Sequence, residues 1–406
     1  MDVATFYATF DERVRAIVAH AYAHAPATRR RFEEAGLTPD AIRSAADLAR
    51  LPVLRKDDLI ALQQADPPFG GLLAVEPARL RRVFQSPGPI NEPEADVADY
   101  WRWAPALEAA GFRPGDIVLN AFSYHLTPAG AMFESGLRAL GCVVLPGGIG
   151  SQEQQIEAMV RLGVTGYIGL PSYLKALLEK AKALGHDPHR WPLRVAFVTA
   201  EPLPPSLRQH LQGYGLTVRQ GYGTAEAGNL GYECEEEAGW HLPEDALVQV
   251  CDINTGQPLP PGQTGEVVVT LFHEAYPLIR FGTGDLSALD PEPCPCGRPT
   301  PRLVGWQGRV GDAVKVRGMF LHPRQAAEVM ARFPDVAAWQ MVVTREAHVD
   351  YLTCRVVPTD PGADREALAE RLARAIRDAL RFRAEIAFVD ALPADAPPIL
   401  DQRTWE

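Results

Sequence analysis

The sequence L-T-V-R-Q-G-Y-G-T-A-E occupies residues 216–226 and sets a glycine turn directly after a short strand-like run. A tight glycine turn at the carboxyl end of a strand is where open α/β sheets place their ligands. In this turn Tyr222 is available to stack on a base, and Glu226 is available to hold a cation. Taken alone, the turn is equally compatible with an ordinary surface glutamate.

Upstream of this turn the chain alternates between short apolar runs and helical patterns. The runs are bounded by Gly, Pro or Asp and cover residues 116–122, 141–146, 165–170 and 193–198. Apolar residues at helical spacing lie between them at 152–162 and 173–182, and also near the N-terminus at 10–35. Alternating strands and helices predict a parallel sheet that is covered by helices on both faces.

Downstream of the turn the pattern changes twice. Residues 245–290 alternate around Pro and Gly turns, which is typical of antiparallel strands. The last hundred residues mix strand and helix patterns, which indicates a small α+β domain. We therefore predict an α/β fold with two parts. A large N-terminal domain, residues 1–307, combines parallel sheets covered by helices with an antiparallel β region, and residues 308–406 form a small C-terminal α+β domain.

Composition excludes several classes of protein. The chain has 406 residues and a net charge of −11, which argues against binding to duplex nucleic acid because phosphate contacts need a basic face. It has no run of about 20 apolar residues, so no membrane helix is expected. Acidic residues stand where a signal peptide would be basic, and the expected location is the cytoplasm. Six cysteines are too few for a disulfide framework.

Further segments give the chain a family resemblance. P-L-I-R-F-G-T-G-D-L at 277–286 and G-R-V-G-D-A-V-K-V-R-G at 308–318 follow the glycine turn. Their order and spacing resemble the adenylate-forming superfamily of acyl-CoA synthetases, adenylation domains and luciferases. The segments D-L-A-R-L-P-V-L-R-K-D-D-L at 47–59 and P-S-Y-L at 171–174 narrow the resemblance to the phenylacetate-CoA ligase family. This family uses ATP and Mg²⁺ to convert a carboxylic acid, usually aromatic, to an acyl adenylate, and then transfers the acyl group to coenzyme A.

The resemblance implies a nucleotide-binding site. By position, Ala200, Glu201 and Pro202 would line the adenine site, and Tyr222, with Gly223 beside it, would stack on adenine.

Three more residues are implied by the same resemblance. Glu226 would ligate Mg²⁺, and Asp285 would bind the ribose hydroxyls, because a carboxylate can accept two charge-assisted hydrogen bonds at once. Arg309 would lie at the junction with the small domain, which rotates between the two half-reactions in family members.

A set of cysteines and one histidine belongs to this resemblance as well. Cys234 and His241 follow the glycine turn, and Cys294 and Cys296 form C-P-C-G, as in several members that carry structural Zn²⁺. Three thiolates and one imidazole satisfy a closed tetrahedral site. The alternative is a turn that contains reduced thiols.

The phosphate-binding loop departs from the family pattern. The family reads S-S-G-T-T-G-K-P, whereas residues 86–93 read S-P-G-P-I-N-E-P. Ser86 and Gly88 remain in register, but Glu92 replaces the lysine. Two like charges at ~4 Å repel by roughly 4 kcal/mol at an effective dielectric constant near 20. We therefore expect Glu92 to disfavour a triphosphate in this degenerate loop.

The C-terminal sequence also departs from the family pattern. The family ends in a sequence like L-P-R-S-x-G-K-A, whose lysine reaches the α-phosphate, but residues 392–399 read L-P-A-D-A-P-P-I. No lysine follows Lys315. Arg403 is nearby, yet a guanidinium is not a geometric equivalent of an ammonium group.

The sequence gives weaker evidence for the acyl pocket than for the nucleotide site. By position, Y-H-L-T-P-A-G at 124–130 replaces a family stretch like Y-G-L-F-T-G-G. Tyr124 and His125 would then face the substrate, and a histidine there could act as an acid or base. The alternative is a histidine that is hydrogen-bonded within its loop.

Two functions follow from these observations. The first is an AMP-forming acid–thiol ligase that uses ATP, Mg²⁺ and coenzyme A on a small-molecule carboxylic acid. The second is a homologue that has lost adenylation, and that binds nucleotide, acyl-CoA or a partner, or transfers acyl groups without ATP. The resemblance also allows a carrier protein as acceptor and a homodimer.

Overall fold

The computed structural model describes residues 2–86, 89–310, 314–317, 319–321, 323–360, 362, 364–393 and 396–404. The chain divides into two compact units. One unit comprises Met1–Leu203 and Arg208–Gly308, and the other comprises Arg309–Glu406 with the short segment Pro204–Leu207.

The large unit is built around an eight-stranded sheet with the order β13-β9-β8-β7-β6-β5-β3-β4. Its strands are β3 (Ile117–Asn120), β4 (Val143–Pro146), β5 (Gly166–Gly169), β6 (Val195–Val198), β7 (Thr217–Thr224), β8 (Gly228–Tyr232), β9 (Trp240–His241) and β13 (Arg302–Leu303). The strands from β7 to β4 are parallel. The predicted α/β class is confirmed.

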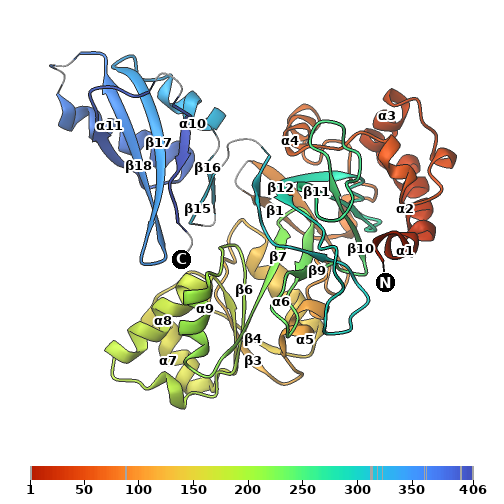
Figure 1. Cartoon of the computed structure of the whole chain (residues 1–406), viewed down its shortest axis with the longest axis horizontal. Coiled ribbons are helices and arrows are strands. Elements are labelled where there is room, and N and C mark those ends of the chain that lie inside the picture. The colour runs from red at the N-terminus through yellow and green to blue at the C-terminus, as the bar shows by residue number, and fades with distance from the viewer. Residues whose placement is uncertain are drawn as a thin grey trace. The chain divides into compact units, whose positions relative to one another are not determined.

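Helices cover this sheet on both faces. They are α5 (Ala104–Ala110), α6 (Ala129–Ala139), α7 (Gln152–Leu162), α8 (Pro171–Ala183) and α9 (Pro205–Gln212). Figure 1 shows α7, α8 and α9 on one face, with α5 and α6 on the other. The antiparallel extension through β8, β9 and β13 was not predicted. Strand β8 reads G-N-L-G-Y, a glycine-rich pattern that is atypical of strands.

A second sheet of the large unit is antiparallel, with the order β10-β11-β12-β14. Its strands are β10 (Ala246–Cys251), β11 (Gly265–Leu271) and β12 (Phe281–Ser287), with the short β14 (Gly308–Arg309) at the boundary where the large unit ends at Gly308. Side chains of the first three strands share a hydrophobic core with N-terminal helices. The helices of this region are α1 (Val3–Ala8), α2 (Asp11–His24), α3 (Pro26–Glu34) and α4 (Lys56–Ala65). The predicted antiparallel region and N-terminal helices are thus present.

A β-hairpin carries the segment that aligns with the phosphate-binding loop. Strands β1 (Leu80–Ser86) and β2 (Ile90–Ala95) pair antiparallel, with Phe84 opposite Glu92 and Ser86 opposite Ile90. Residues 87 and 88 between them lie outside the described residues, and with them the predicted loop residue Gly88.

The small unit contains a four-stranded sheet with the order β19-β18-β17-β20. Its elements are β15 (Val314–Val316), β16 (Met319–Leu321), α10 (Pro323–Met330), β17 (Val336–Glu346), β18 (Val349–Pro358), α11 (Arg365–Leu380), β19 (Glu385–Phe388) and β20 (Ile399–Asp401). Strand β20 pairs in parallel with β17 and was not predicted. Three residues, preceded by two prolines, give too short a pattern to identify as a strand.

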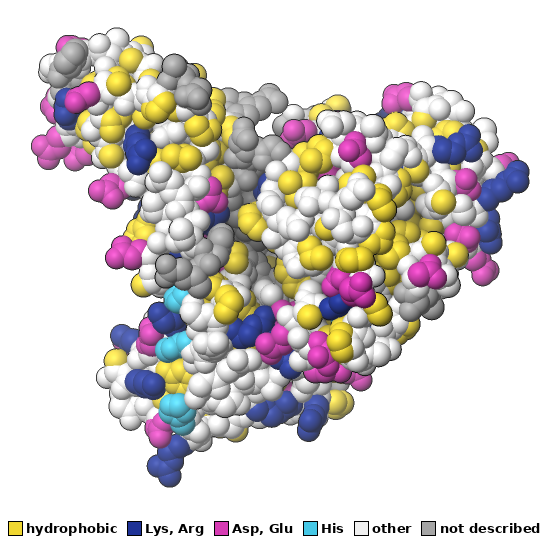
Figure 2. Space-filling view, viewed as in Figure 1, with side chains coloured by type: hydrophobic (Ala, Val, Ile, Leu, Met, Phe, Trp, Pro, Cys, Tyr) yellow, Lys and Arg dark blue, Asp and Glu magenta, His cyan; other side chains and the backbone are white. Residues whose placement is uncertain are grey.

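Charge is mixed on the surface of both units. Figure 2 shows basic and acidic side chains interspersed on the face that it presents. Within the described part of the chain, no helix combines the length and apolarity that a membrane crossing requires.

The first testable prediction concerns the core beneath the parallel sheet. Phe197 on β6 is fully buried, and its ring contacts those of Trp103 and Phe133. Replacing it (Phe197→Ala) should destabilise the large unit by about 3–5 kcal/mol, because a buried cavity is left behind. Urea unfolding measures this loss. The control, Leu162→Ala at a half-exposed position, should change stability by less than about 1 kcal/mol, and equal losses in both variants would contradict the prediction.

Candidate functional site

Two turns meet at the carboxyl ends of neighbouring parallel strands. Val198 on β6 is the register partner of Gln220 on β7. Thr199 follows β6, and its hydroxyl donates to the Gly221 carbonyl at 2.7 Å. The next residue, Ala200, has a φ of +68°, which turns the chain sharply. The segments 200–202 and 220–226 are therefore held next to each other, at the sheet edge where α/β proteins bind ligands.

The glycine in the second turn is required sterically. A Cβ on Gly223 would lie 2.2 Å from the Gly228 carbonyl oxygen, so no larger residue fits here without moving the backbone. The pairing of β7 with β8 also shifts register between Tyr222 and Gly223. The G-Y-G sequence thus lets the two strands approach closely, which directs the turn that carries Glu226.

Tyr222 and Asp285 lie in direct contact. The Tyr222 hydroxyl donates to Asp285 Oδ2 at 3.0 Å, and the Trp306 indole donates to Asp285 Oδ1 at 3.3 Å. The Tyr222 ring stacks on Trp240, with centroids 5.2 Å apart and planes 13° from parallel. Each carboxylate oxygen can accept more than one hydrogen bond, so Asp285 keeps acceptor capacity for hydroxyl groups. Trp306 and Trp240 had been given no role by sequence reasoning.

The residues proposed for the adenine site are half-buried. Glu201 accepts a hydrogen bond from the hydroxyl of Ser172, near the start of α8, at 2.6 Å. This bond holds the 200–202 turn, including Pro202, against the parallel sheet.

Glu226 pairs with a lysine from a distant segment. Lys56 is the first residue of α4, and its Nζ lies 2.6 Å from Glu226 Oε1. Asp58 accepts the Arg55 backbone N–H at 2.9 Å, which caps the helix and fixes the position of Lys56. Burial disfavours the charged form of Glu226, but the Lys56 ammonium outweighs burial, so the pKa of Glu226 falls below its usual value. Sequence reasoning gave Lys56 no role, and nothing in its local sequence marks it.

Glu92 lies beside this ion pair rather than in solvent. It is 3% exposed, and the Ser86 hydroxyl donates to its Oε1 at 2.7 Å. Burial, together with the negative charge of Glu226, raises the pKa of Glu92 to about 8. Burial therefore favours the neutral form in the free protein. The expectation of a Glu92 anion treated this carboxyl as solvated, whereas the structure buries it.

The segment before α5 positions the Glu226 turn. Arg102 has a φ of +62°, and its guanidinium donates to the Ala227 carbonyl. Asn229 donates to the Arg102 carbonyl at 3.1 Å through its side chain and to the Trp101 carbonyl at 3.0 Å through its backbone. These bonds fix the residues that follow Glu226. Sequence reasoning missed Arg102, whose role depends on contacts more than a hundred residues away.

The predicted metal ligands come together. The ligand atoms of Cys234, His241, Cys294 and Cys296 all lie within 4.8 Å of one another. Cys234 Sγ is 3.6 Å from Cys294 Sγ, and Cys296 Sγ is 3.4 Å from His241 Nε2. A tetrahedral zinc ion with Zn–S bonds of about 2.3 Å would place its sulfur ligands about 3.8 Å apart. The four residues thus fit such an ion.

His241 has the protonation state that a metal ligand needs. Its Nδ1 lies 2.9 Å from the Thr300 hydroxyl, which leaves Nε2 facing the cysteines. Burial lowers the pKa of His241 to about 4, so the imidazole is neutral at pH 7. A neutral imidazole that is oriented through its other nitrogen is the usual form of a zinc-bound histidine.

The predicted acyl-pocket residues lie between β3 and α6. The Tyr124 hydroxyl accepts a hydrogen bond from the Asn120 side chain at 2.8 Å. His125 is exposed, and its backbone N–H donates to the Ser123 hydroxyl at 3.2 Å. Their role in substrate binding stays a prediction.

Two residues considered in the sequence analysis, Arg309 and Arg403, belong to the small unit. Arg309 is its first residue after the boundary at Gly308. Arg403 is 3% exposed, and it pairs with Asp350 at 3.0 Å and with Asp401 at 2.6 Å. Because these ion pairs hold the guanidinium inside its own unit, Arg403 is a poor substitute for a lysine that must reach a substrate.

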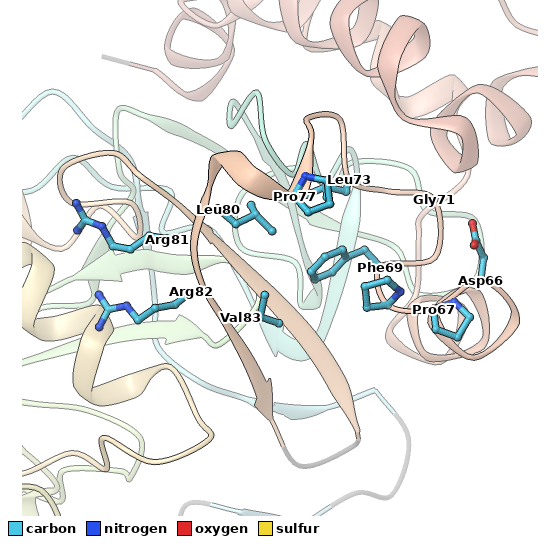
Figure 3. A pocket seen from close by; sticks show the side chains of 11 residues that line it. Asp66, Pro67, Phe69, Gly71, Leu73, Pro77, Leu80, Arg81, Arg82 and Val83 are labelled. Carbon is cyan, nitrogen blue, oxygen red and sulfur yellow. The ribbon is translucent and has the colours of Figure 1, made fainter.

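A groove of about 530 Å³ lies elsewhere on the large unit, between residues 66–77 and β1 (Figure 3). Its walls are mainly apolar, and two arginines line it. Arg81 pairs with Asp96, and Arg82 pairs with Glu94. None of the predicted site residues lines this groove.

Comparison with known proteins agrees with this geometry. A family model described as AMP-binding enzyme matches residues 95–271. A phenylacetate-coenzyme A ligase of Thermus thermophilus is 34% identical over 95% of this chain and 92% of its own length. The Escherichia coli K12 phenylacetate-coenzyme A ligase is 31% identical, over 85% of this chain and 80% of its own.

A solved structure of a CoA ligase has the same fold. A crystal structure of 2-hydroxyisobutyryl-CoA ligase, in complex with 2-HIB-AMP and CoA, superposes with a TM-score of 0.89 at 27% identity. The match covers 99% of this chain and 91% of that one. The sequence matches and the arrangement of the two turns lead to one conclusion: the chain belongs to the phenylacetate-CoA ligase family of adenylate-forming enzymes.

Proposed function

We propose that this protein is an AMP-forming ligase that activates a small carboxylic acid with ATP and transfers the acyl group to coenzyme A. The observation that carries the proposal is similarity to phenylacetate-coenzyme A ligases along 95% of the chain. The contact between Tyr222 and Asp285 supports it, because two residues proposed for one nucleotide meet in space. Nothing in the comparisons favours a homologue without adenylation.

The chemistry proceeds in two displacements. A carboxylate oxygen of the acid attacks the α-phosphorus of ATP, and the bond to pyrophosphate breaks. The thiol of coenzyme A then attacks the acyl carbon, loses its proton and releases AMP. In this proposal Tyr222 and the 200–202 turn hold the adenine, Asp285 accepts the ribose hydroxyls, and Glu226 holds Mg²⁺. When bound, Mg²⁺ supplies positive charge that offsets the phosphate charges.

The small unit has a separate part in the proposal. Residues 308–406 would form a mobile domain, with Arg309 at its start, that changes position between the two displacements. Coenzyme A is the proposed acceptor. A carrier protein, a homodimer and a cytoplasmic location stay predictions from the sequence.

The second testable prediction concerns adenylation itself. Purified protein should catalyse pyrophosphate exchange into ATP that depends on an added acid, tested with phenylacetate, benzoate, 2-hydroxyisobutyrate and short alkyl acids. Asp285→Asn should lower kcat/KM by about 10- to 100-fold, because a hydrogen bond to a charged group contributes roughly 1.5–3 kcal/mol.

The control for this assay is Asp378→Asn, at a largely exposed position on α11, which should exchange at the wild-type rate. A complete lack of exchange with every acid would overturn the proposal and leave the non-adenylating alternative. Calorimetry with AMP, coenzyme A and acyl-CoA would then identify what the protein binds.

We also propose that Cys234, His241, Cys294 and Cys296 hold a structural zinc ion. The ion would hold together β8, β9 and the segment before β13, because Cys234 follows β8, His241 lies on β9, and both Cys294 and Cys296 precede β13. The thiolates and the imidazole close the coordination sphere, so the site would stabilise the fold and take no part in the reaction.

The third testable prediction concerns this metal. Protein purified without added metal should contain about one zinc per chain by mass spectrometry of the metal. The double variant C294S/C296S should lose the zinc and melt at a lower temperature, because two of the four ligands are gone. The control, Cys142→Ser at a cysteine outside the cluster, should retain zinc. A wild-type zinc content below about 0.2 per chain would contradict the site.

A further inference from the structure

A small cavity lies between the hairpin β1–β2 and the turn that carries Glu226. Its volume is about 10 Å³, and its lining includes Glu92, Tyr100, Ala225, Glu226 and Tyr276. A space of this size holds about one water molecule or one ion. Two carboxyl groups from segments more than a hundred residues apart therefore line a space of ionic dimensions.

One oxygen of Glu92 has no hydrogen-bond partner within the described part of the chain. The Glu92 residue is only 3% exposed. Its Oε1 accepts a hydrogen bond from the Ser86 hydroxyl, but its Oε2 is buried and has no hydrogen-bond partner among the described residues. Buried polar atoms in folded proteins are nearly always paired, and each exception requires an explanation. A ligand that binds in the cavity would satisfy Glu92 Oε2.

The charges around the cavity identify the kind of ligand. Burial favours a protonated Glu92 in the free protein, so a cation that enters the cavity must displace this proton. Glu92 and Glu226 then carry two negative charges, and Lys56, 2.6 Å from Glu226, carries one positive charge. The resulting net charge of −1 would hold the cation. Oxygen ligands are those that Mg²⁺ and Mn²⁺ prefer, and a divalent ion would change the local charge to +1.

We propose that Glu92 is a second carboxylate ligand of the divalent cation that Glu226 is expected to hold. Glu92 and Glu226 would hold the cation together, and Lys56 would move away from Glu226 when it binds. The metal then supplies, next to the phosphates, the positive charge that a loop lysine supplies in the resembled family. This inference rests on the proposed function for its purpose, but metal binding itself can be measured without nucleotide.

The fourth testable prediction is that two substitutions at this cavity change the affinity for Mn²⁺ in opposite directions. Mn²⁺ is titrated into free full-length protein without ATP or acid, and unbound Mn²⁺ is measured by electron paramagnetic resonance. Glu92→Gln should weaken Mn²⁺ binding at least tenfold, because one charged ligand is lost. Lys56→Met should strengthen it several-fold, because the competing ammonium is removed. Glu92→Asp, which keeps the carboxylate, should retain more affinity than Glu92→Gln.

The control is Glu157→Gln on the exposed face of α7, which should bind Mn²⁺ as the wild type does. Thermal unfolding of each variant verifies that it is folded. The inference is overturned if the wild type binds no Mn²⁺ at millimolar concentration, if folded Glu92→Gln binds it with wild-type affinity, or if Lys56→Met weakens binding as much as Glu92→Gln.

Failure of this inference and failure of the proposed function give different results. Pyrophosphate exchange with unchanged Mn²⁺ affinity in Glu92→Gln overturns only the role of Glu92. Mn²⁺ binding that depends on Glu92, in a protein that shows no exchange with any acid, overturns only the ligase proposal.

Discussion

The hydrogen bond between Tyr222 and Asp285 joins the two sheets of the large unit, and the candidate site exists because they meet there. Tyr222 belongs to β7 of the parallel sheet, and Asp285 belongs to β12 of the antiparallel sheet. Thr283, also on β12, accepts from the same tyrosine at 3.3 Å and donates to the Val267 carbonyl on β11 at 2.9 Å. A stacking surface and a carboxylate acceptor are thereby held at a fixed separation, which a nucleoside requires.

Much of this architecture could be predicted from local patterns. The strands β3 to β6 coincide with short apolar runs between Gly, Pro and Asp. For the largely buried strands β3, β5 and β6 the reason is that strands buried on both faces are nearly all apolar. The meeting of Tyr222 and Asp285 came from the family resemblance. Their separation of 63 residues has no period that indicates contact. Strand β8 was missed because tertiary pairing, rather than β-propensity, makes G-N-L-G-Y a strand.

The site residues that sequence reasoning missed share one property, since each acts through contacts between distant segments. Lys56 reaches Glu226 from the start of α4, and Arg102 reaches Ala227 from the segment before α5. The cysteine and histidine cluster was predicted from the family resemblance, which includes the local C-P-C-G sequence. A lone lysine or arginine carries no comparable signal.

The charge of Glu92 shows most directly what a sequence leaves out. Read as a residue in a solvated loop, it places a negative charge where phosphates would bind. Burial changes this in the free protein, because a closed cavity beside Glu226 favours the protonated form of the carboxyl. Lys56 at the same time balances the charge of Glu226. With Glu92 protonated, the side chains of Glu92, Glu226 and Lys56 carry no net charge, so the loss of a loop lysine does not by itself leave a negative site. Whether a glutamate opposes or assists phosphate binding therefore depends on what fills the cavity beside it.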